Sequence, residues 1–255
     1  MDVIMTSPQV TYRIYLQGDK ATSWPRHETK VIKDKWKTLT QIYISNPEEL
    51  PESWYFEKIE EPIAKCEIIT PSEHVWAMMK LATDRRWVQT NQTYIDDTRI
   101  LLSYEIPMLE LVGDFYDELK SLSSWYASLS YEFLRFQEDD LVKLDILVAG
   151  DRMSALSTIV HRSRARNVWS VICKKLRDNI PRALFSIAIQ ASLWSNIIAR
   201  ETLSAFRKDV TAGLYGGDIS RKKKVLSKQK KGKKKMKQFG KVSIPSDTFV
   251  NILKK

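Results

Sequence analysis

The residues of this chain with the most pronounced chemical character form a run of cations near its C-terminal end. Between Ile219 and Lys241 there are twelve Lys and Arg residues and no Asp or Glu, whereas the 255-residue chain carries 41 basic and 31 acidic residues in all. Residues 1–218 hold 27 basic against 30 acidic side chains. The sequence therefore indicates one strongly basic segment attached to a slightly acidic remainder.

Lys and Arg in such a run neutralise phosphates and release their counterions, which gives a salt-dependent affinity for nucleic acid. The alternatives are a solvated tail, a nuclear-targeting or heparin-binding patch, and a membrane-surface helix, for which the apolar face is thin. Apolar residues in 242–245 and 249–253 can dock back onto a folded body, so the run is internal, which favours nucleic acid. Phosphate contacts are expected from Arg221, Lys222, Lys223, Lys224, Lys228, Lys230, Lys231, Lys233, Lys234, Lys235 and Lys237, supported by Arg207 and Lys208.

Motifs for catalysis are missing from the sequence. A nucleotide-hydrolysing site needs a G-x-x-x-x-G-K-[ST] loop, and Gly216-Gly217 lacks the Lys-Ser/Thr that should follow at the required offset. Zinc spacing is missing because the histidines are isolated from one another and from cysteine. The sequence predicts no catalytic residue, no metal site, and neither a cofactor nor a small-molecule substrate in this chain.

Adjacent carboxylates and the two cysteines favour structural roles. Neighbouring side chains point to different sides of a strand or helix, so Asp96-Asp97 and Asp139-Asp140 suit turns or caps. Cys66 and Cys173 are far apart in sequence and are interpreted as buried hydrophobic residues in a reducing compartment. No apolar run is long enough to span a bilayer, and the first residues do not resemble a signal peptide.

Apolar periodicity predicts an α+β fold. Between residues 60 and 138 it indicates the order βαββαβ, which is typical of ferredoxin-like domains. A second α+β unit is expected to begin near Leu141. The predicted strands cover 62–69, 87–94, 99–105, 126–133, 141–148, 155–160, 184–190 and 196–199, with helices after 70–73, Pro107 and Ser163 and a short helix over 201–208.

The flanking segments carry further expectations. Residues 1–16 alternate like a strand, and residues 17–57 are interpreted as an insertion and a linker because they mix charged, Pro and aromatic residues. In the basic run, Ser220 is expected to cap a helix and Gly232 to break it.

Several segments carry a family resemblance. They include Arg207-Lys208-Asp209-Val210-Thr211-Ala212, Tyr215-Gly216-Gly217-Asp218-Ile219-Ser220-Arg221-Lys222-Lys223-Lys224 and Gly232-Lys233-Lys234-Lys235-Met236-Lys237. The likeness continues back through Leu141–Leu147, Tyr104-Glu105-Ile106-Pro107 and Ser7-Pro8-Gln9-Val10. These segments closely resemble the C-terminal half of the elongation factor 4 (LepA) family of translational GTPases.

The resemblance implies a domain order. Residues 1–45 are expected to be a remnant of domain III, 46–57 a linker, and 58–138 a ferredoxin-like domain of the elongation factor G domain V type. Residues 139–255 are expected to form the LepA-type C-terminal α+β domain, with a basic helical or extended arm over 219–241. The GTPase domain, with its GTP and Mg, would lie outside this chain.

The resemblance also implies a function. It predicts the ribosome- and tRNA-binding portion of a factor that remodels or back-translocates ribosomes and affects the fidelity of protein synthesis. The expected partners are ribosomal RNA and tRNA. The expected location is cytoplasmic and ribosome-associated, with the inner face of the cell membrane or an organellar matrix as alternatives. A free-standing ribosome- or RNA-binding protein without GTPase, and a peripheral membrane-surface protein, are the other hypotheses.

Five tryptophans depart from the family pattern. Trp76, Trp87, Trp125, Trp169 and Trp194 stand where that pattern has glycine, and the chain has 8 Gly and 8 Trp, against roughly 18 Gly expected from ordinary usage. We hypothesise that the source decodes UGA as glycine and that these five residues are glycines translated as tryptophan. A decaying pseudogene is the alternative, and UGG codons at the five positions would contradict recoding.

Overall fold

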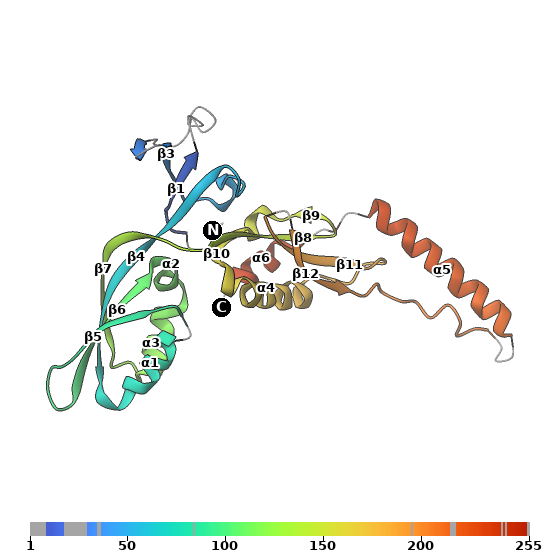
Figure 1. Cartoon of the computed structure of the whole chain (residues 1–255). Coiled ribbons are helices and arrows are strands. Elements are labelled where there is room, and N and C mark those ends of the chain that lie inside the picture. Colours follow the sequence, from blue (N-terminus) through green and yellow to red (C-terminus); the bar gives the residue numbers. More distant parts are fainter. Residues whose placement is uncertain are drawn as a thin grey trace, which may run out of the picture. The chain divides into compact units, whose positions relative to one another are not determined.

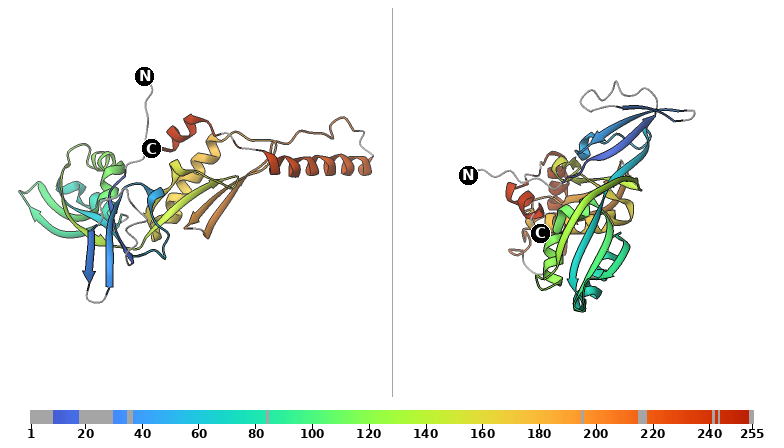
Figure 2. Two further views of the ribbon diagram at one scale, coloured as in Figure 1. Left: turned by 90° about the horizontal axis from the view of Figure 1, so that it is seen from above. Right: turned by 90° about the vertical axis from the view of Figure 1, so that its left-hand side faces the viewer.

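Two compact α+β units make up the chain in the computed structural model. The structure describes residues 9–17, 30–34, 37–83, 85–194, 196–214, 218–240, 242 and 244–253. The units, called here the first unit and the second unit, are Ser7–Leu141 and Val142–Lys255, each with its own antiparallel sheet and helices (Figures 1 and 2). The predicted α+β class is confirmed. None of the described helices has the length and apolarity needed to cross a bilayer.

The first unit is built on a seven-stranded sheet. Its strands are β1 (Tyr12–Gln17), β2 (Lys30–Asp34), β3 (Lys37–Ile44), β4 (Phe56–Pro71), β5 (Val88–Tyr94), β6 (Arg99–Pro107) and β7 (Ser128–Glu138). Its helical elements are η2 (Pro47–Glu49), η3 (Ser72–His74), α1 (Val75–Thr83), α2 (Met108–Glu110), the π-helical turn η4 (Leu111–Phe115) and α3 (Tyr116–Leu122).

Strands β4 to β7 form the predicted ferredoxin-like arrangement. Along the chain they alternate with helices as βαββαβ, and in space they pair antiparallel in the order β7-β4-β6-β5. Alternate residues of β4, such as Cys66 and Ile68, are buried against Met78 of α1 and against Phe115 and Leu119. A strand that buries every second side chain has one apolar face, so helices are needed on that face only. The two helices of the βαββαβ order supply this cover.

Strand β4 continues beyond this domain and joins it to β1. Its first part pairs with β1, which in turn pairs with β3, while β2 pairs with β3. The interpretation of residues 17–57 as an insertion and a linker therefore misses two strands. Lys30–Asp34 and Lys37–Ile44 are paired through the sheet, and this pairing is not visible in local propensity, because Lys and Thr residues interrupt the apolar alternation.

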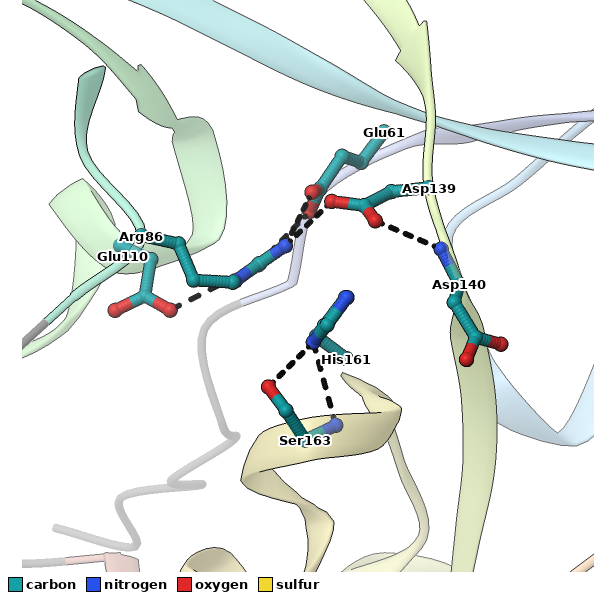
Figure 3. Close-up of polar contacts among 7 residues, drawn as sticks. All are labelled: Glu61, Arg86, Glu110, Asp139, Asp140, His161 and Ser163. Carbon is teal, nitrogen blue, oxygen red and sulfur yellow. Dashed lines mark hydrogen bonds and ion pairs between the residues drawn. The ribbon is translucent and has the colours of Figure 1, made fainter.

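A partly buried ionic cluster connects three elements of the first unit (Figure 3). One guanidinium nitrogen of Arg86 lies 2.9 Å from a carboxylate oxygen of Glu61 on β4 and 2.7 Å from Asp139, which follows β7. Glu110 of α2 approaches to 3.9 Å. Asp139 is therefore an ion-pair partner as well as a turn residue, whereas Asp96 accepts bonds from the backbone N–H groups of Thr98 and Arg99, as expected of a turn. One cation thus faces three carboxylates.

The cluster makes stability depend on pH through Glu61. Burial raises the pKa of Glu61 to about 7, since burial and Asp139 outweigh the favourable contact with Arg86. The folded state then favours the protonated acid, so the free energy of unfolding falls as pH rises from about 4.5 to about 7. We expect Glu61→Gln to lose part of this fall, by at most about 3 kcal/mol. Urea unfolding of both proteins across that window measures it; parallel curves would contradict it.

The second unit has a five-stranded sheet with helices on one face. Its strands are β8 (Leu141–Val148), β9 (Asp151–Arg152), β10 (Thr158–His161), β11 (Ile187–Leu193) and β12 (Asn196–Leu203). Its helical elements are η5 (Ser154–Leu156), η6 (Arg162–Arg164), α4 (Ala165–Asn179), α5 (Ile219–Phe239) and α6 (Ser246–Leu253). The strand order is β10-β8-β11-β12, with β9 beside β8.

Helix α4 packs its apolar stripe on this sheet. His161 caps η6, the turn that leads into α4, by accepting a bond from the backbone N–H of Ser163 (Figure 3). Trp169, Cys173 and Leu176 are buried against β8 and β11, and the helix ends at the cap residue Ile180. Both cysteines of the chain are free and buried, and burial raises the pKa of each thiol to about 12.

The C-terminal residues dock back on the same unit, as the sequence predicted. Val242, Ile244 and Phe249 pack against its core. Lys175 of α4 donates through Nζ to the carbonyl oxygens of Asn251 and Ile252, which satisfies free groups at the end of α6. Helix α6 is therefore held on α4 by apolar and polar contacts together.

The predicted short helix over 201–208 is wrong. Residues 201–203 are the last residues of β12, and Leu203 lies opposite Ile187 of β11. Residues 204–209 have no regular structure. The pairing with β11 and the burial of Leu203 outweigh the helical propensity of Glu201.

Two tryptophans have the left-handed backbone conformation that favours glycine. The φ angles are +71° at Trp125 and +56° at Trp194. Trp194 is the first residue of the two-residue loop between Leu193 and Asn196, which are paired in β11 and β12. Ser124, at +50°, also has a positive φ, so the end of α3 has two such residues in succession. A bulky residue in this region is a genuine outlier.

Candidate nucleic-acid interface

The basic run forms one continuous helix, α5, which begins and ends on defined caps. The backbone N–H of Arg221 donates to Oδ1 of Asp218 at 2.9 Å, and the backbone N–H of Gly240 donates to the carbonyl of Met236 at 2.7 Å. Asp218 is therefore the N-terminal cap, and Ser220, predicted as the cap, lies in the first turn. An acidic cap also complements the helix dipole.

Gly232 does not break α5, contrary to prediction. The helix runs from Ile219 to Phe239 without interruption. An interior glycine costs only about 1 kcal/mol relative to alanine, which neighbouring residues of high helix propensity can offset. The glycine that ends the helix is Gly240.

One side of α5 faces the extended segment 204–214. Val225, Leu226, Gln229 and Gly232 are half-buried, and Nε2 of Gln229 donates to the carbonyl oxygen of Lys208 at 2.9 Å. Segment 204–214 leads away from the sheet of the second unit and α5 leads back toward it (Figures 1 and 2). We call α5 and residues 204–214 together the arm.

The cations are distributed unevenly around α5. Lys222 and Lys233 are half-buried on the side that faces the extended segment. Arg207 and Lys208 are exposed on that segment. The exposed cations of the helix itself are Arg221, Lys223, Lys224, Lys228, Lys230, Lys231, Lys234, Lys235 and Lys237. The predicted contact residues are thus brought together on one arm, with two of them turned partly inward.

The cations of α5 have no acidic neighbours on the helix to balance their charge. Lys230 and Lys234, and likewise Lys231 and Lys235, are four residues apart on the helix, where like charges repel. No residue within Ile219–Lys237 carries a negative charge, and the only flanking acid is the cap, Asp218. Phosphates bound along the exposed face would remove this repulsion, so the geometry suits nucleic acid. Tyr215, Gly216, Gly217 and Lys241 lie outside the described residues.

Gly240, the residue that follows α5, lies close to Phe185 of the core of the second unit. A Cβ atom at this position would lie 2.7 Å from Cζ of Phe185 and 2.8 Å from the carbonyl oxygen of Met236. Glycine is therefore required by close approach. The contacts of Gly240, Asp218 and Gln229 are not predicted from the sequence above, although an Asp before a helix and a Gly after it are known capping signals.

Alanine at Gly232 within α5 and at Gly240 just after it is expected to have opposite effects. Gly240→Ala should lower the free energy of unfolding of the second unit by about 1–3 kcal/mol through overpacking. Gly232→Ala meets nothing within 4 Å and should raise the helicity and stability of α5 by about 0.5–1 kcal/mol. Circular dichroism and urea unfolding of both variants measure this. Equal effects at both positions would contradict the contact with Phe185.

Charge divides between the two units. Residues 7–141 carry 15 Lys and Arg against 23 Asp and Glu, and residues 142–218 carry 12 against 6. The remainder outside the run is therefore not uniformly acidic, because its second part is basic even without α5. Exposed cations of α4, such as Arg166 and Lys174, contribute to this excess. The second unit as a whole suits a polyanion, and the first unit does not.

Comparisons with known proteins agree with this arrangement. Residues 58–147 match the family described as "Elongation factor G C-terminus", and residues 148–254 match "GTP-binding protein LepA C-terminus". The chain is similar to proteins named "Elongation factor 4" from Chlorobium phaeobacteroides (46% identity over 99% of this chain), Sulfurimonas denitrificans (45%, 100%) and Acetivibrio thermocellus (49%, 92%). It spans only 39–41% of the length of these relatives.

The two family matches, in this order along the chain, place it in the class of C-terminal portions of translation factors. The match of residues 148–254 to the LepA C-terminus and the similarity to elongation factor 4 over nearly the whole chain identify the particular factor. The chain belongs to the elongation factor 4 (LepA) family and corresponds to its C-terminal part.

Proposed function

We propose that this chain is the ribosome- and tRNA-binding portion of an elongation factor 4-like translation factor, and that the arm contacts RNA phosphates. The observation that carries the proposal is the helix α5, with nine exposed cations and no acidic residue along Ile219–Lys237. The relatives named elongation factor 4 support a place in translation. Remodelling or back-translocation of ribosomes, and any GTP hydrolysis, would need the parts of those relatives that this chain does not span.

RNA is favoured over a membrane surface by the shape of the arm. A helix that lies on a bilayer buries a broad apolar face. The side of α5 occupied by Val225, Gln229 and Gly232 already faces the extended segment, and cations surround the rest. Such a helix neutralises phosphates along its length but has little apolar surface to insert.

Charge reversal near the start of α5 tests the proposal. Lys222→Glu, Lys223→Glu and Lys224→Glu together should weaken binding of the whole chain to deacylated tRNA and to ribosomes. The slope of log affinity against log salt should also become less steep, because fewer counterions are released. Filter binding at several salt concentrations measures both. Unchanged affinity with the same slope would refute the role of the arm.

A further inference from the structure

Strand β7 of the first unit leaves one of its edges open. Its eleven residues, Ser128–Glu138, pair with β4 from Ile69 to Glu60. Both β1 and β6 pair with the opposite edge of β4, so they do not cover β7. Within the described part of the chain no strand pairs with the outer edge of β7. An open edge of this length offers unpaired backbone groups to an added strand.

Aromatic side chains line one face of this edge. Tyr131 lies opposite Cys66, and Phe133 lies opposite Ala64, in the register with β4. Because these β4 residues are buried under the helices, Tyr131 and Phe133 project from the helix-covered face at its rim. They are 59% and 52% exposed. An added strand would cover both rings with alternate side chains.

The row of rings continues along the sheet. The ring of Phe136 lies 5.3 Å from that of Phe133 and 6.0 Å from that of Tyr43 on β3. The guanidinium of Arg13 lies over Phe136 at 4.4 Å. This contact extends the apolar row beyond β7 and holds it in place.

Single-stranded RNA is a poor candidate for the first unit. Ferredoxin-like domains that bind RNA stack bases on aromatic residues of the open sheet face. Here that face carries Lys65 and Glu67 of β4 and Glu105 of β6, together with Ser103, which is itself buried. Lys65 pairs with Glu67 at 3.0 Å, and Arg135 pairs with Glu105 at 2.6 Å. The open face is therefore polar, carries its own ion pairs and lacks a stacking platform.

We propose that β7 docks an extended, basic protein segment, which adds to the sheet as a further strand and places apolar side chains over Tyr131 and Phe133. Charge selects this partner, because residues 7–141 carry 15 cations against 23 carboxylates. On β7 itself Glu132 and Glu138 are exposed; Glu132 has one long approach of 3.9 Å to Lys65, whereas Arg135 is held at 2.6 Å by Glu105. Main-chain bonds supply affinity and alternate side chains supply specificity in this mode of recognition.

A synthetic eleven-residue peptide of alternating Lys and Val tests the proposal on the whole chain. Fluorescence anisotropy should detect its binding, and a Gln/Val peptide of the same length should bind more weakly. Tyr131→Ser with Phe133→Ser should reduce the affinity about tenfold. The matched control is Tyr94→Ser, which removes an exposed tyrosine from β5 at the opposite edge of the sheet. A loss caused by Tyr94→Ser alone would overturn the choice of β7.

Backbone methylation of the peptide separates strand addition from mere surface adhesion. An added strand uses alternate N–H groups. One set of alternate N-methyl groups should therefore abolish binding, and the other set should leave it intact. Equal binding of both methylated peptides would overturn strand addition. A second copy of this chain is the competing partner for β7. If sedimentation shows self-association that depends on Tyr131 and Phe133, and the peptide does not bind, the proposal of a basic segment as the partner is wrong. Tyr131→Ser alone serves if the double variant does not fold.

Discussion

The double variant Trp125→Gly, Trp194→Gly is expected to unfold at a higher urea concentration than the chain with both tryptophans. A left-handed backbone costs an L-residue other than glycine roughly 1–2 kcal/mol. Both tryptophans have this conformation. We therefore expect the free energy of unfolding of each unit to rise by about 1–2 kcal/mol, because each unit holds one of the two residues. Urea unfolding followed by far-ultraviolet circular dichroism measures it without the tryptophan signal.

The turn at Trp194 gives the clearer reason to expect that glycine stabilises the fold. Two-residue hairpin loops adopt the primed turn types, which need a positive φ at the first central residue and strongly prefer glycine or asparagine. Trp194 occupies that position between the paired residues Leu193 and Asn196. Its backbone N–H donates to the carbonyl of Lys143 at 3.2 Å. Glycine would keep this bond and remove the strain at Cβ.

The backbone at the end of α3 gives a similar reason to expect stabilisation by glycine at position 125. The backbone N–H of Trp125 donates to the carbonyl of Lys120 at 2.7 Å, and that of Ser124 donates to Ser121 at 3.4 Å. This pair of bonds is the Schellman arrangement, in which the residue after the helix cap adopts a positive φ. Here the following residue, Trp125, adopts it as well. Its side chain is 73% exposed, so little packing is lost when it is removed.

Trp76→Gly is the matched control. Trp76 is 81% exposed in α1 and has no positive φ, so the same substitution removes no strain and adds a glycine to a helix. We expect a loss of up to about 1 kcal/mol instead of a gain. If Trp76→Gly stabilises as much as the substitutions at Trp125 and Trp194, the backbone explanation is wrong.

The recoding hypothesis predicts the same residues in the natural polypeptide. If UGA is decoded as glycine, peptides of the protein isolated from its source contain Gly at positions 125 and 194. Mass spectrometry of those peptides measures it directly. Trp87 and Trp169 are buried in the cores and carry no positive φ, although the buried indole N–H of Trp87 has no hydrogen-bond partner among the residues that the structure describes. For these two positions the backbone adds no argument.

Local patterns were sufficient for most of the fold and for the position of the arm. The alternation around Cys66 and Ile68 predicts β4 because each buried side chain is followed by an exposed or half-exposed one. The cluster around Arg86 was not predictable, since Glu61, Glu110 and Asp139 are distant in sequence and meet only in the folded unit. The erroneous helix over 201–208 has a similar cause, because pairing with β11 is a long-range effect.

The inward and outward faces of α5 also lay beyond sequence analysis. Eleven cations follow one another with only Val225 and Leu226 as a weak apolar signal in the first half of the helix. The inward face is marked by Gln229, which donates a hydrogen bond to the carbonyl oxygen of Lys208. Lys208 belongs to the segment that comes before the helix in the sequence. A single Gln within a run of lysines does not predict a contact of this kind.

The two faces of α5 lead to the last prediction, which compares two pairs of lysines with the same spacing. Lys223→Gln with Lys234→Gln removes two charges from the exposed face, and Lys222→Gln with Lys233→Gln removes two from the half-buried side. Each pair is eleven residues apart, and Gln has nearly the helix propensity of Lys, so charge and helicity change alike. The two variants differ only in the face of α5 from which the positive charges are removed.

Binding of deacylated tRNA is expected to distinguish the pairs. Each phosphate contact contributes about 0.7–0.9 to the slope of log affinity against log salt. The exposed-face variant should therefore lose about 1.4–1.8 of this slope and bind at least about tenfold more weakly at low salt, whereas the inner-face variant should change much less. Anisotropy titrations at four salt concentrations measure both quantities. Equal losses for the two pairs would mean that the arm attracts RNA as a diffuse charge, without a preferred contact face.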